Sequence, residues 1–123
     1  MSAPRPTEAE LSILQVLWER GPATVKEVHQ ALTREREMGY TASLKLMQTM
    51  FDKGLLHRDD SERAHRYWPV VAKDRTQKAL LGDFLDKVFA GSAPDLVQMA
   101  LQGRRLKAEE KEALKALLQE KRP

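Results

Sequence analysis

Residues 41–69 read TASLKLMQTMFDKGLLHRDDSERAHRYWP, and this stretch decides the fold. Its first half has apolar residues at helical spacing, and the helical pattern stops at Lys53-Gly54, where glycine suits a helix end. Two short alternating segments follow, at residues 55–58 and 65–69, with a charged turn between them. A helix followed by a β-hairpin is the last part of a winged helix-turn-helix, so the pattern predicts this DNA-reading module.

Two capping-box sequences, Thr7–Glu10 and Thr24–Glu27, mark the starts of two shorter helices upstream. In such a box the threonine oxygen accepts a hydrogen bond from a helix amide, and the glutamate accepts one from the threonine amide. Because Gly21-Pro22 breaks the pattern between them, we expect the first helix to end near residue 20 and the second to cover about 25–34.

The helical spacing also predicts part of the core. Trp18 lies on the apolar stripe of the first helix, so we interpret it as a core residue rather than a stacking platform for a ligand. We expect the third helix to be capped by Thr41 and to turn Leu46, Met47 and Met50 inward.

The length of 123 residues suits one small domain or two very small units. Cysteine is absent, which excludes disulfides, thiolate metal sites and cysteine nucleophiles, and is compatible with a reducing compartment. No apolar run approaches the roughly 20 residues that span a bilayer, and residues 1–6 lack the apolar core of a signal peptide. We therefore expect a cytoplasmic protein without direct membrane insertion.

The net charge of +3 is unevenly distributed along the chain. Residues 1–70 contain ten basic and ten acidic side chains, whereas residues 71–123 contain eleven basic and eight acidic ones. Overall basicity therefore carries no argument that the predicted module binds DNA, and the placement of individual charges must do so.

The polar side of the third helix is expected to enter the major groove. Glutamine can pair with adenine, lysine can donate to guanine, and threonine or alanine methyl groups can touch the thymine methyl group. The alternative is a solvated helix face with no ligand. The predicted DNA-reading residues are Thr41, Ala42, Lys45, Gln48 and Thr49.

The predicted wing carries positive groups that can neutralise phosphates or enter a minor groove. The alternative is a solvated hairpin in which the arginines pair with the nearby acids Asp59, Asp60 and Glu62. The predicted wing contacts are Arg58, Arg63, His65 and Arg66.

Catalytic and metal-binding functions find no support in the sequence. No nucleophile and base occur in a recognised arrangement, and no glycine-rich phosphate loop is present, so we expect neither an enzyme nor a cofactor. His29, His57 and His65 lack the i, i+4 spacing that many metal sites use, so we expect no metal site.

Beyond residue 72 the apolar residues recur on helices that are too few to enclose one another. Full burial of one such side chain contributes about 1.5–3 kcal/mol, and several together can exceed an association cost of about 4–15 kcal/mol. We therefore expect a homodimer, with a helical arm folded back on its own domain as the alternative. The predicted dimerisation residues are Leu81, Phe84, Leu85, Val88, Leu96, Leu114, Leu117 and Leu118.

Several motifs together resemble the BlaI/MecI/CopY type of bacterial transcriptional repressor, named for the penicillinase repressors. The resemblance covers essentially the whole chain. Its strongest parts are residues 17–28 (LWERGPATVKEV), Tyr40-Thr41, Lys53-Gly54-Leu55 and residues 63–67 (RAHRY).

The resemblance implies a mainly α chain with a small β-hairpin wing. Residues 1–72 would form the winged helix-turn-helix DNA-binding domain and residues 73–123 the helical dimerisation domain. It also implies a membrane-embedded metalloprotease sensor as a partner in several family members, and the bond that is cut there aligns with Met99-Ala100. Thr49 and Asp52 stand where the family often has basic residues, so fewer positive charges face the DNA.

These expectations together describe a dimeric transcriptional repressor that occupies a roughly palindromic operator in double-stranded DNA and is released by proteolysis in its helical domain. The alternative is a winged-helix protein-interaction module, which the neutral charge balance of residues 1–70 favours.

Overall fold

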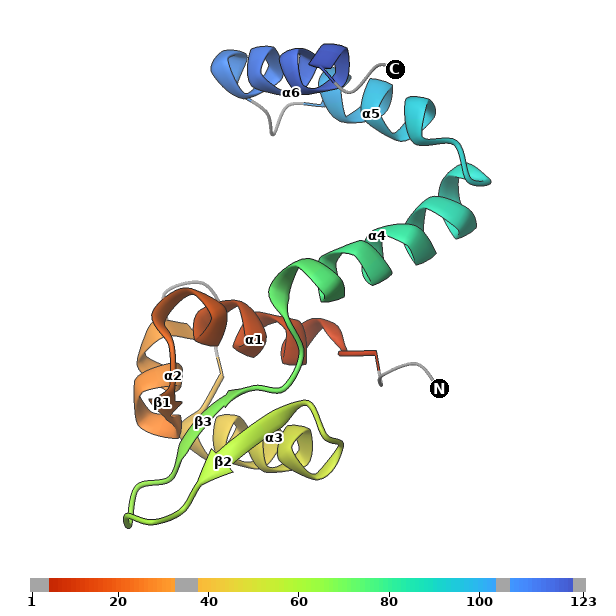
Figure 1. Cartoon of the computed structure of the whole chain (residues 1–123). Helices are drawn as coiled ribbons and strands as arrows, with labels where there is room; N and C mark the ends of the chain where they lie inside the picture. The colour runs from red at the N-terminus through yellow and green to blue at the C-terminus, as the bar shows by residue number, and fades with distance from the viewer. Residues whose placement is uncertain (1–4, 33–37, 104–106, 121–123) are drawn as a thin grey trace. The chain divides into compact units, whose positions relative to one another are not determined.

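The computed structural model describes residues 5–32, 38–103 and 107–120, and the chain divides into two compact units, residues 1–78 and 79–123 (Figure 1). The predicted end of the second helix near residue 34 lies outside the described residues.

Helix α1 (Glu8–Arg20) begins with the predicted capping box. The Thr7 amide donates to Glu10 Oε1 at 2.9 Å, and the Glu10 amide donates to Thr7 Oγ1 at 3.2 Å. The helix ends at Gly21, whose φ of 91° lies in the left-handed region that glycine adopts without steric cost. The sequence therefore predicted both ends of α1.

Helix α2 (Val25–Leu32) begins with the second predicted capping box. The Thr24 amide donates to Glu27 Oε1 at 2.9 Å, and the Glu27 amide donates to Thr24 Oγ1 at 3.2 Å. The predicted start of this helix is confirmed.

Helix α3 (Tyr40–Asp52) begins two residues earlier than a cap at Thr41 would allow. Gly39 is the N-cap residue and makes no side-chain cap, while Thr41 lies inside the first turn, so the prediction of a Thr41 cap is wrong. The earlier start brings the Tyr40 ring edge-on to His29, with ring centroids 5.9 Å apart. This contact is between residues far apart in sequence, and helical periodicity does not reveal it.

The end of α3 follows the prediction from Gly54. Gly54 has φ of 84°, its amide donates to the Phe51 carbonyl, and the Leu55 amide donates to the Met50 carbonyl at 2.9 Å. These two bonds form a Schellman motif, which satisfies the last carbonyls of the helix and turns the chain into the wing.

The wing contains strands β2 (Leu56–Asp59) and β3 (Arg66–Pro69), as predicted, but it belongs to a three-stranded antiparallel sheet. The sheet has the order β1-β3-β2, and the additional strand β1 (Ala23–Thr24) was not predicted. Two residues are too short for an alternating pattern, so β1 is set by its pairing with β3 and not by its own sequence.

The core of the first unit lies between the three helices and the sheet. Met47 and Met50 point inward as predicted, whereas Leu46 is only partly buried, and Ser43 is fully buried. Among the described residues, the buried apolar side chains are Ile13, Leu14, Leu17, Ala23, Val25, Val28, Leu32, Met47, Met50, Leu55, Leu56 and Tyr67. This arrangement confirms the predicted winged helix-turn-helix.

Trp18 packs at the edge of this core, and its indole Nε1 donates to the Val71 carbonyl at 3.1 Å. The bond joins α1 to the chain that leaves the wing. Trp18 is therefore a structural residue, in agreement with its predicted role.

One charged group is buried among these contacts. The Glu10 side chain is 3% exposed, and its two oxygens accept hydrogen bonds from Lys53 Nζ at 2.9 and 2.8 Å. Burial raises the pKa of Glu10, but the bonds from Lys53 and Thr7 together outweigh burial and hold the pKa below its ordinary value. The ion pair fastens the start of α1 to the end of α3.

The second part of the chain contains helices α4 (Lys73–Phe89), α5 (Ala93–Gln102) and α6 (Ala108–Glu120). Ser92 caps α5, since its Oγ accepts a hydrogen bond from the Asp95 amide at 3.3 Å. Among the described helices, none is both long enough and apolar enough to cross a membrane.

We predict that Glu10→Gln lowers the free energy of unfolding by about 1–3 kcal/mol, because Lys53 loses a charged acceptor while glutamine keeps the capping box. Chemical denaturation at neutral pH measures this loss. Glu27→Gln makes the same change in the other capping box, where the carboxylate is 35% exposed, and should cost less than about 1 kcal/mol. Equal losses in the two variants would contradict the assigned role of Glu10.

The pKa of Glu10 also sets the pH range of this contribution. Since the folded state lowers the pKa, the stabilisation is present above the ordinary carboxyl value of 4.5 and is lost as pH falls through the lower folded value. Glu10→Gln should remove this part of the acid dependence.

Candidate DNA-binding surface

The outer face of α3 presents the residues that the sequence predicts to read DNA, and every one of them is exposed. They are Thr41, Ala42, Lys45, Gln48 and Thr49. Ser43, Met47 and Met50 hold the opposite side of the helix against the core. The packing behind α3 therefore directs hydroxyl, amide and ammonium groups toward solvent, where base edges can meet them.

Asp52 shares this outer face, because it follows Gln48 by four residues and Thr49 by three. It is exposed and lies in the last turn of α3, where the helix dipole disfavours a negative charge. With Lys45 as the basic residue of the face, the reading surface has no net charge. A face without net charge attracts a polyanion weakly, so its exposed hydrogen-bonding groups are the feature that suits base edges.

Arg58 is placed differently from the other predicted wing contacts. Its guanidinium carbon lies 4.0 Å from the centre of the Phe51 ring, and its NH2 group is 3.4 Å from Asp60 Oδ2. The side chain is only 25% exposed. Arg58 thus fastens β2 to the end of α3, and it reaches solvent less than the other arginines of the wing do.

Arg66 lies on β3 directly across from Thr24 on β1, and its side chain is 51% exposed. Its NH1 group is 3.6 Å from Glu27 Oε1. Glu27 Oε2 accepts a hydrogen bond from Arg20 NH2 at 3.3 Å, so one carboxylate meets arginines from two elements.

Glu27 therefore has two roles: it completes the predicted capping box, and it pairs with Arg20 and Arg66. The bond from the Thr24 amide lowers the pKa of Glu27 most, and the charges of Arg20 and Arg66 lower it further. The capping-box pattern identified Glu27 but not its two arginines. The turn at Gly21 brings Arg20 from α1, and the pairing of β1 with β3 brings Arg66.

The tip of the wing is rich in acids. Asp59 Oδ1 accepts a hydrogen bond from the Ser61 amide at 3.0 Å, and the amide and hydroxyl of Ser61 lower the pKa of Asp59. Arg63 is exposed nearby, and His65 is partly buried. The structure thus brings Arg63, His65 and Arg66 to one hairpin together with the acids that the sequence raised as alternative partners.

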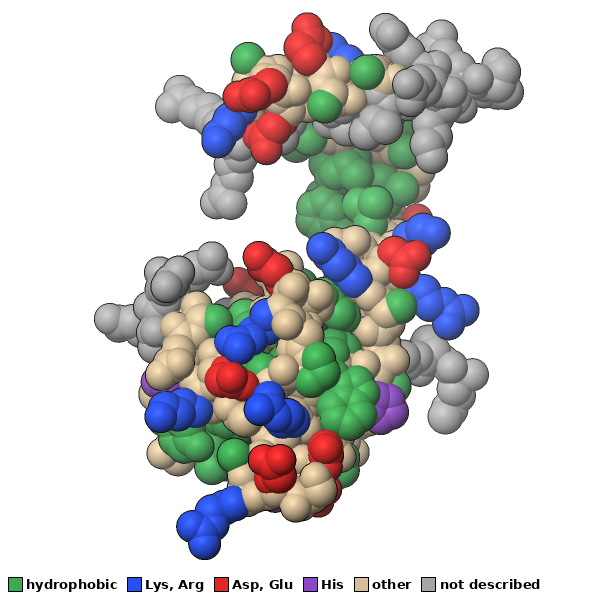
Figure 2. All heavy atoms as spheres, turned by 60° about the vertical axis from the view of Figure 1, so that its left-hand side comes forward, with side chains coloured by type: hydrophobic (Ala, Val, Ile, Leu, Met, Phe, Trp, Pro, Cys, Tyr) green, Lys and Arg blue, Asp and Glu red, His purple; other side chains and the backbone are tan. Residues whose placement is uncertain are grey.

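Figure 2 shows the same mixture over one face of the molecule, where basic and acidic side chains of the first unit alternate.

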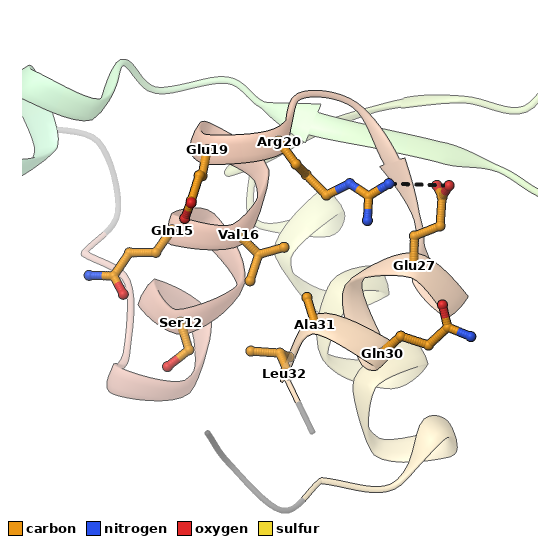
Figure 3. A pocket seen from close by; sticks show the side chains of 9 residues that line it. All are labelled: Ser12, Gln15, Val16, Glu19, Arg20, Glu27, Gln30, Ala31 and Leu32. Atoms are coloured by element: carbon orange, nitrogen blue, oxygen red, sulfur yellow. Dashed lines mark hydrogen bonds and ion pairs between the residues drawn. The ribbon is translucent and has the colours of Figure 1, made fainter. Parts of the chain in front are cut away.

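A hollow of about 740 Å³ lies between α1 and α2, and none of the predicted DNA contacts lines it (Figure 3). The lining residues are Ser12, Gln15, Val16, Glu19, Arg20, Glu27, Gln30, Ala31 and Leu32. In the described ranges, no three histidine or carboxylate side chains converge on a possible metal site.

The second part of the chain leaves large apolar side chains uncovered. Leu81, Phe84 and Val88 on α4 are 49–59% exposed, and Leu85 and Leu96 are partly buried. Figure 2 shows apolar side chains gathered on the surface of these helices. The side chains of Leu114, Leu117 and Leu118 lie outside the part of the chain that the structure describes.

The predicted cleavage pair lies within α5, where Met99 is 61% exposed and Ala100 is also exposed. The peptide bond between them is part of a helix. The helix must therefore open locally before a protease that binds its substrate as an extended chain can cut this bond.

Comparison with known proteins gives a consistent family. The family model described as "Penicillinase repressor" matches residues 6–120. The transcriptional regulator BlaI of Mycobacterium tuberculosis (strain ATCC 25618 / H37Rv) is 35% identical over 79 residues, which are 63% of this chain and 57% of that protein. The chain therefore matches less than two thirds of that relative's length. The penicillinase repressor of Bacillus licheniformis is 26% identical over 121 residues, covering 95% of this chain and 91% of that protein.

A solved structure has the fold of the first unit. It is the solution structure of the Bacillus licheniformis BlaI monomeric form in complex with the blaP half-operator, which matches with a TM-score of 0.52 and 20% sequence identity. The match covers 59% of this chain and 89% of that chain.

Proposed function

We propose, from the premise that this chain belongs to the penicillinase repressor family, that it is a transcriptional repressor that binds operator DNA. The observation that carries this proposal is the outer face of α3, whose polar groups are exposed beside an arginine-bearing wing. The operator complex of the similar BlaI structure supports the same use of this fold. Such a repressor acts in the cytoplasm, where it competes with RNA polymerase for a promoter.

In this proposal α3 reads bases and the wing contacts the backbone. Gln48 and Lys45 provide an amide and an ammonium group for adenine and guanine edges in the major groove. Arg63 and Arg66 contact phosphates on the flank, which sets the register without selecting a sequence. The remaining residues of the proposed surface are Thr41, Ala42, Thr49 and His65. Arg58 belongs to it as well, and its contact with Phe51 fastens the wing to α3.

We further propose that the chain acts as a homodimer, with residues 1–72 binding DNA and residues 73–123 joining the two copies. The support is the uncovered apolar face of α4, since large exposed apolar side chains mark association surfaces. Two linked winged units bind two half-sites more tightly than one, because the second contact becomes intramolecular. A roughly palindromic operator matches such a two-fold arrangement.

Release from DNA is proposed to follow proteolysis between Met99 and Ala100. The cut would remove α6 from the dimerisation region, and the family resemblance suggests a membrane-embedded metalloprotease sensor as the agent. The exposure of this pair supports access once α5 opens locally.

A protein-interaction module is the second candidate function, and the equal numbers of acids and bases in residues 1–70 favour it. Binding to the region upstream of the chain's own gene, measured in a gel shift with excess competitor DNA, separates the two. Retention of that region supports the repressor, whereas no preference over the competitor supports the protein-interaction module.

We predict a steep salt dependence of DNA binding. If the dimer neutralises about six to ten phosphates, affinity should fall by roughly 10³- to 10⁵-fold between about 50 and 200 mM salt, because counterions are released on binding. Fluorescence anisotropy with a labelled duplex measures this slope. An affinity that does not change with salt would contradict phosphate contact.

Base reading and backbone contact should separate by mutation. Gln48→Ala and Lys45→Ala should each weaken the preferred sequence by about 1–3 kcal/mol and relax the choice of base in one half-site. Arg66→Ala should weaken all sequences more evenly. Binding to a library of randomised duplexes measures both effects, and an unchanged base profile in both α3 variants would place the reading face elsewhere.

The dimer interface is tested with Phe84→Glu, which puts a charge on the exposed apolar face of α4. The variant should be monomeric in light scattering, because burying the new carboxylate is unfavourable. The winged unit should keep its melting temperature, since Phe84 is 49% exposed. Gln77→Glu adds the same charge at another exposed position of α4 and should remain dimeric. A dimeric Phe84→Glu variant would exclude this face from the interface.

A further inference from the structure

The carboxylate of Glu27 is shared between a helix cap and two arginines. Oε1 accepts from the Thr24 amide at 2.9 Å and lies 3.6 Å from Arg66 NH1, while Oε2 accepts from Arg20 NH2 at 3.3 Å. Figure 3 shows Arg20 extending from the end of α1 toward Glu27 on α2. Three elements therefore meet at a single negative charge.

The fold brings these groups together without a strong bond between the arginines and the carboxylate. The turn at Gly21 places the end of α1 beside α2, and the β1–β3 register sets Arg66 opposite Thr24. Arg66 is 51% exposed and Arg20 is 43% exposed. Because exposed ion pairs contribute little, another anion can compete for either guanidinium.

The two arginines differ in how they hold Glu27. Arg20 makes a hydrogen bond, whereas Arg66 stands farther away, is more exposed and lies on the wing strand that the proposed function turns toward the phosphates. A guanidinium binds phosphate in the same forked geometry as carboxylate. Arg66 is thus the arginine that can exchange partners.

We propose that Glu27 holds Arg66 in the free protein and gives it up to a DNA phosphate on binding, while Arg20 stays on Glu27 and neutralises the carboxylate that is left. This proposal rests on the proposed DNA-binding function. It makes Glu27 a positioning residue that limits the affinity for the DNA backbone, whatever the base sequence.

The cap alone does not require the charge of Glu27. A capping box works with glutamine as well as with glutamate, because the threonine amide needs only an oxygen acceptor. Glu27→Gln therefore keeps the start of α2 and removes only the charge that pairs with the arginines.

Glu19→Gln is the matched control. Glu19 is exposed on the last turn of α1, points away from the Arg20–Glu27 pair in Figure 3, and makes no ion pair with any residue that the structure describes. Both variants raise the net charge by one, so they are matched in total charge.

The experiment measures the affinity of the full chain for a labelled random-sequence duplex of about three helical turns, by fluorescence anisotropy at constant salt. Glu27→Gln should bind about three- to fivefold more tightly than Glu19→Gln, as expected for the loss of one competing exposed ion pair. In the Arg66→Ala background the two glutamine variants should bind equally, because no arginine remains to be released.

Three results would overturn the proposal: equal affinities of the two single variants, weaker binding by Glu27→Gln, or an advantage of Glu27→Gln that persists without Arg66. Failure of the unaltered chain to bind any duplex would instead reject the proposed function, so the two failures are distinguishable.

A second measurement uses the unaltered chain and does not depend on how a variant folds. Carbon NMR titration of the Glu27 carboxyl group gives its pKa with and without the duplex. DNA should raise this pKa, because Arg66 leaves and a phosphate arrives, and an unchanged or lowered pKa would overturn the proposal.

Discussion

The Glu10–Lys53 ion pair is the contact on which the geometry of the winged unit depends. It joins residues 43 positions apart, one in the capping box of α1 and the other at the C-cap of α3. A buried carboxylate without its partner is costly, so α3 is kept in the orientation that lets Lys53 reach Glu10. Apolar contacts are non-directional, whereas two hydrogen bonds from the Lys53 ammonium group to the Glu10 carboxylate require a specific arrangement. Together with the packing of Ser43, Met47 and Met50 against the core, this ion pair fixes the direction of the outer face of α3.

Local signals predicted most of the helix ends, because these ends are made by residues close in sequence. Both capping boxes and the Gly54 turn depend on contacts within a few residues, which a sequence displays directly. Strand β1, the early start of α3 and the Glu10–Lys53 pair depend on partners from distant segments. Periodicity and capping rules contain no information about such partners.

The candidate site was predictable in its positions more than in its interactions. The exposed positions of α3 follow from helical spacing, which is why all five lie on one outer face. The wing arginines were predicted from their charge and their position on the hairpin. Neither property indicates which side chains lie beside them in the folded chain. Arg58 lies on Phe51 and Arg66 beside Glu27, since the sheet register and the end of α3 bring those side chains together.

For the proposed repressor, the interspersed acids of the winged unit would affect how the chain finds its operator among other DNA. A genome offers on the order of 10⁶ or more competing sites, and sequence-independent attraction holds a protein on them. Asp52 on the outer face of α3 and the carboxylates beside the wing arginines reduce that attraction. In the proposed role, each copy would spend less time on irrelevant DNA, and fewer copies would be needed to keep one promoter occupied.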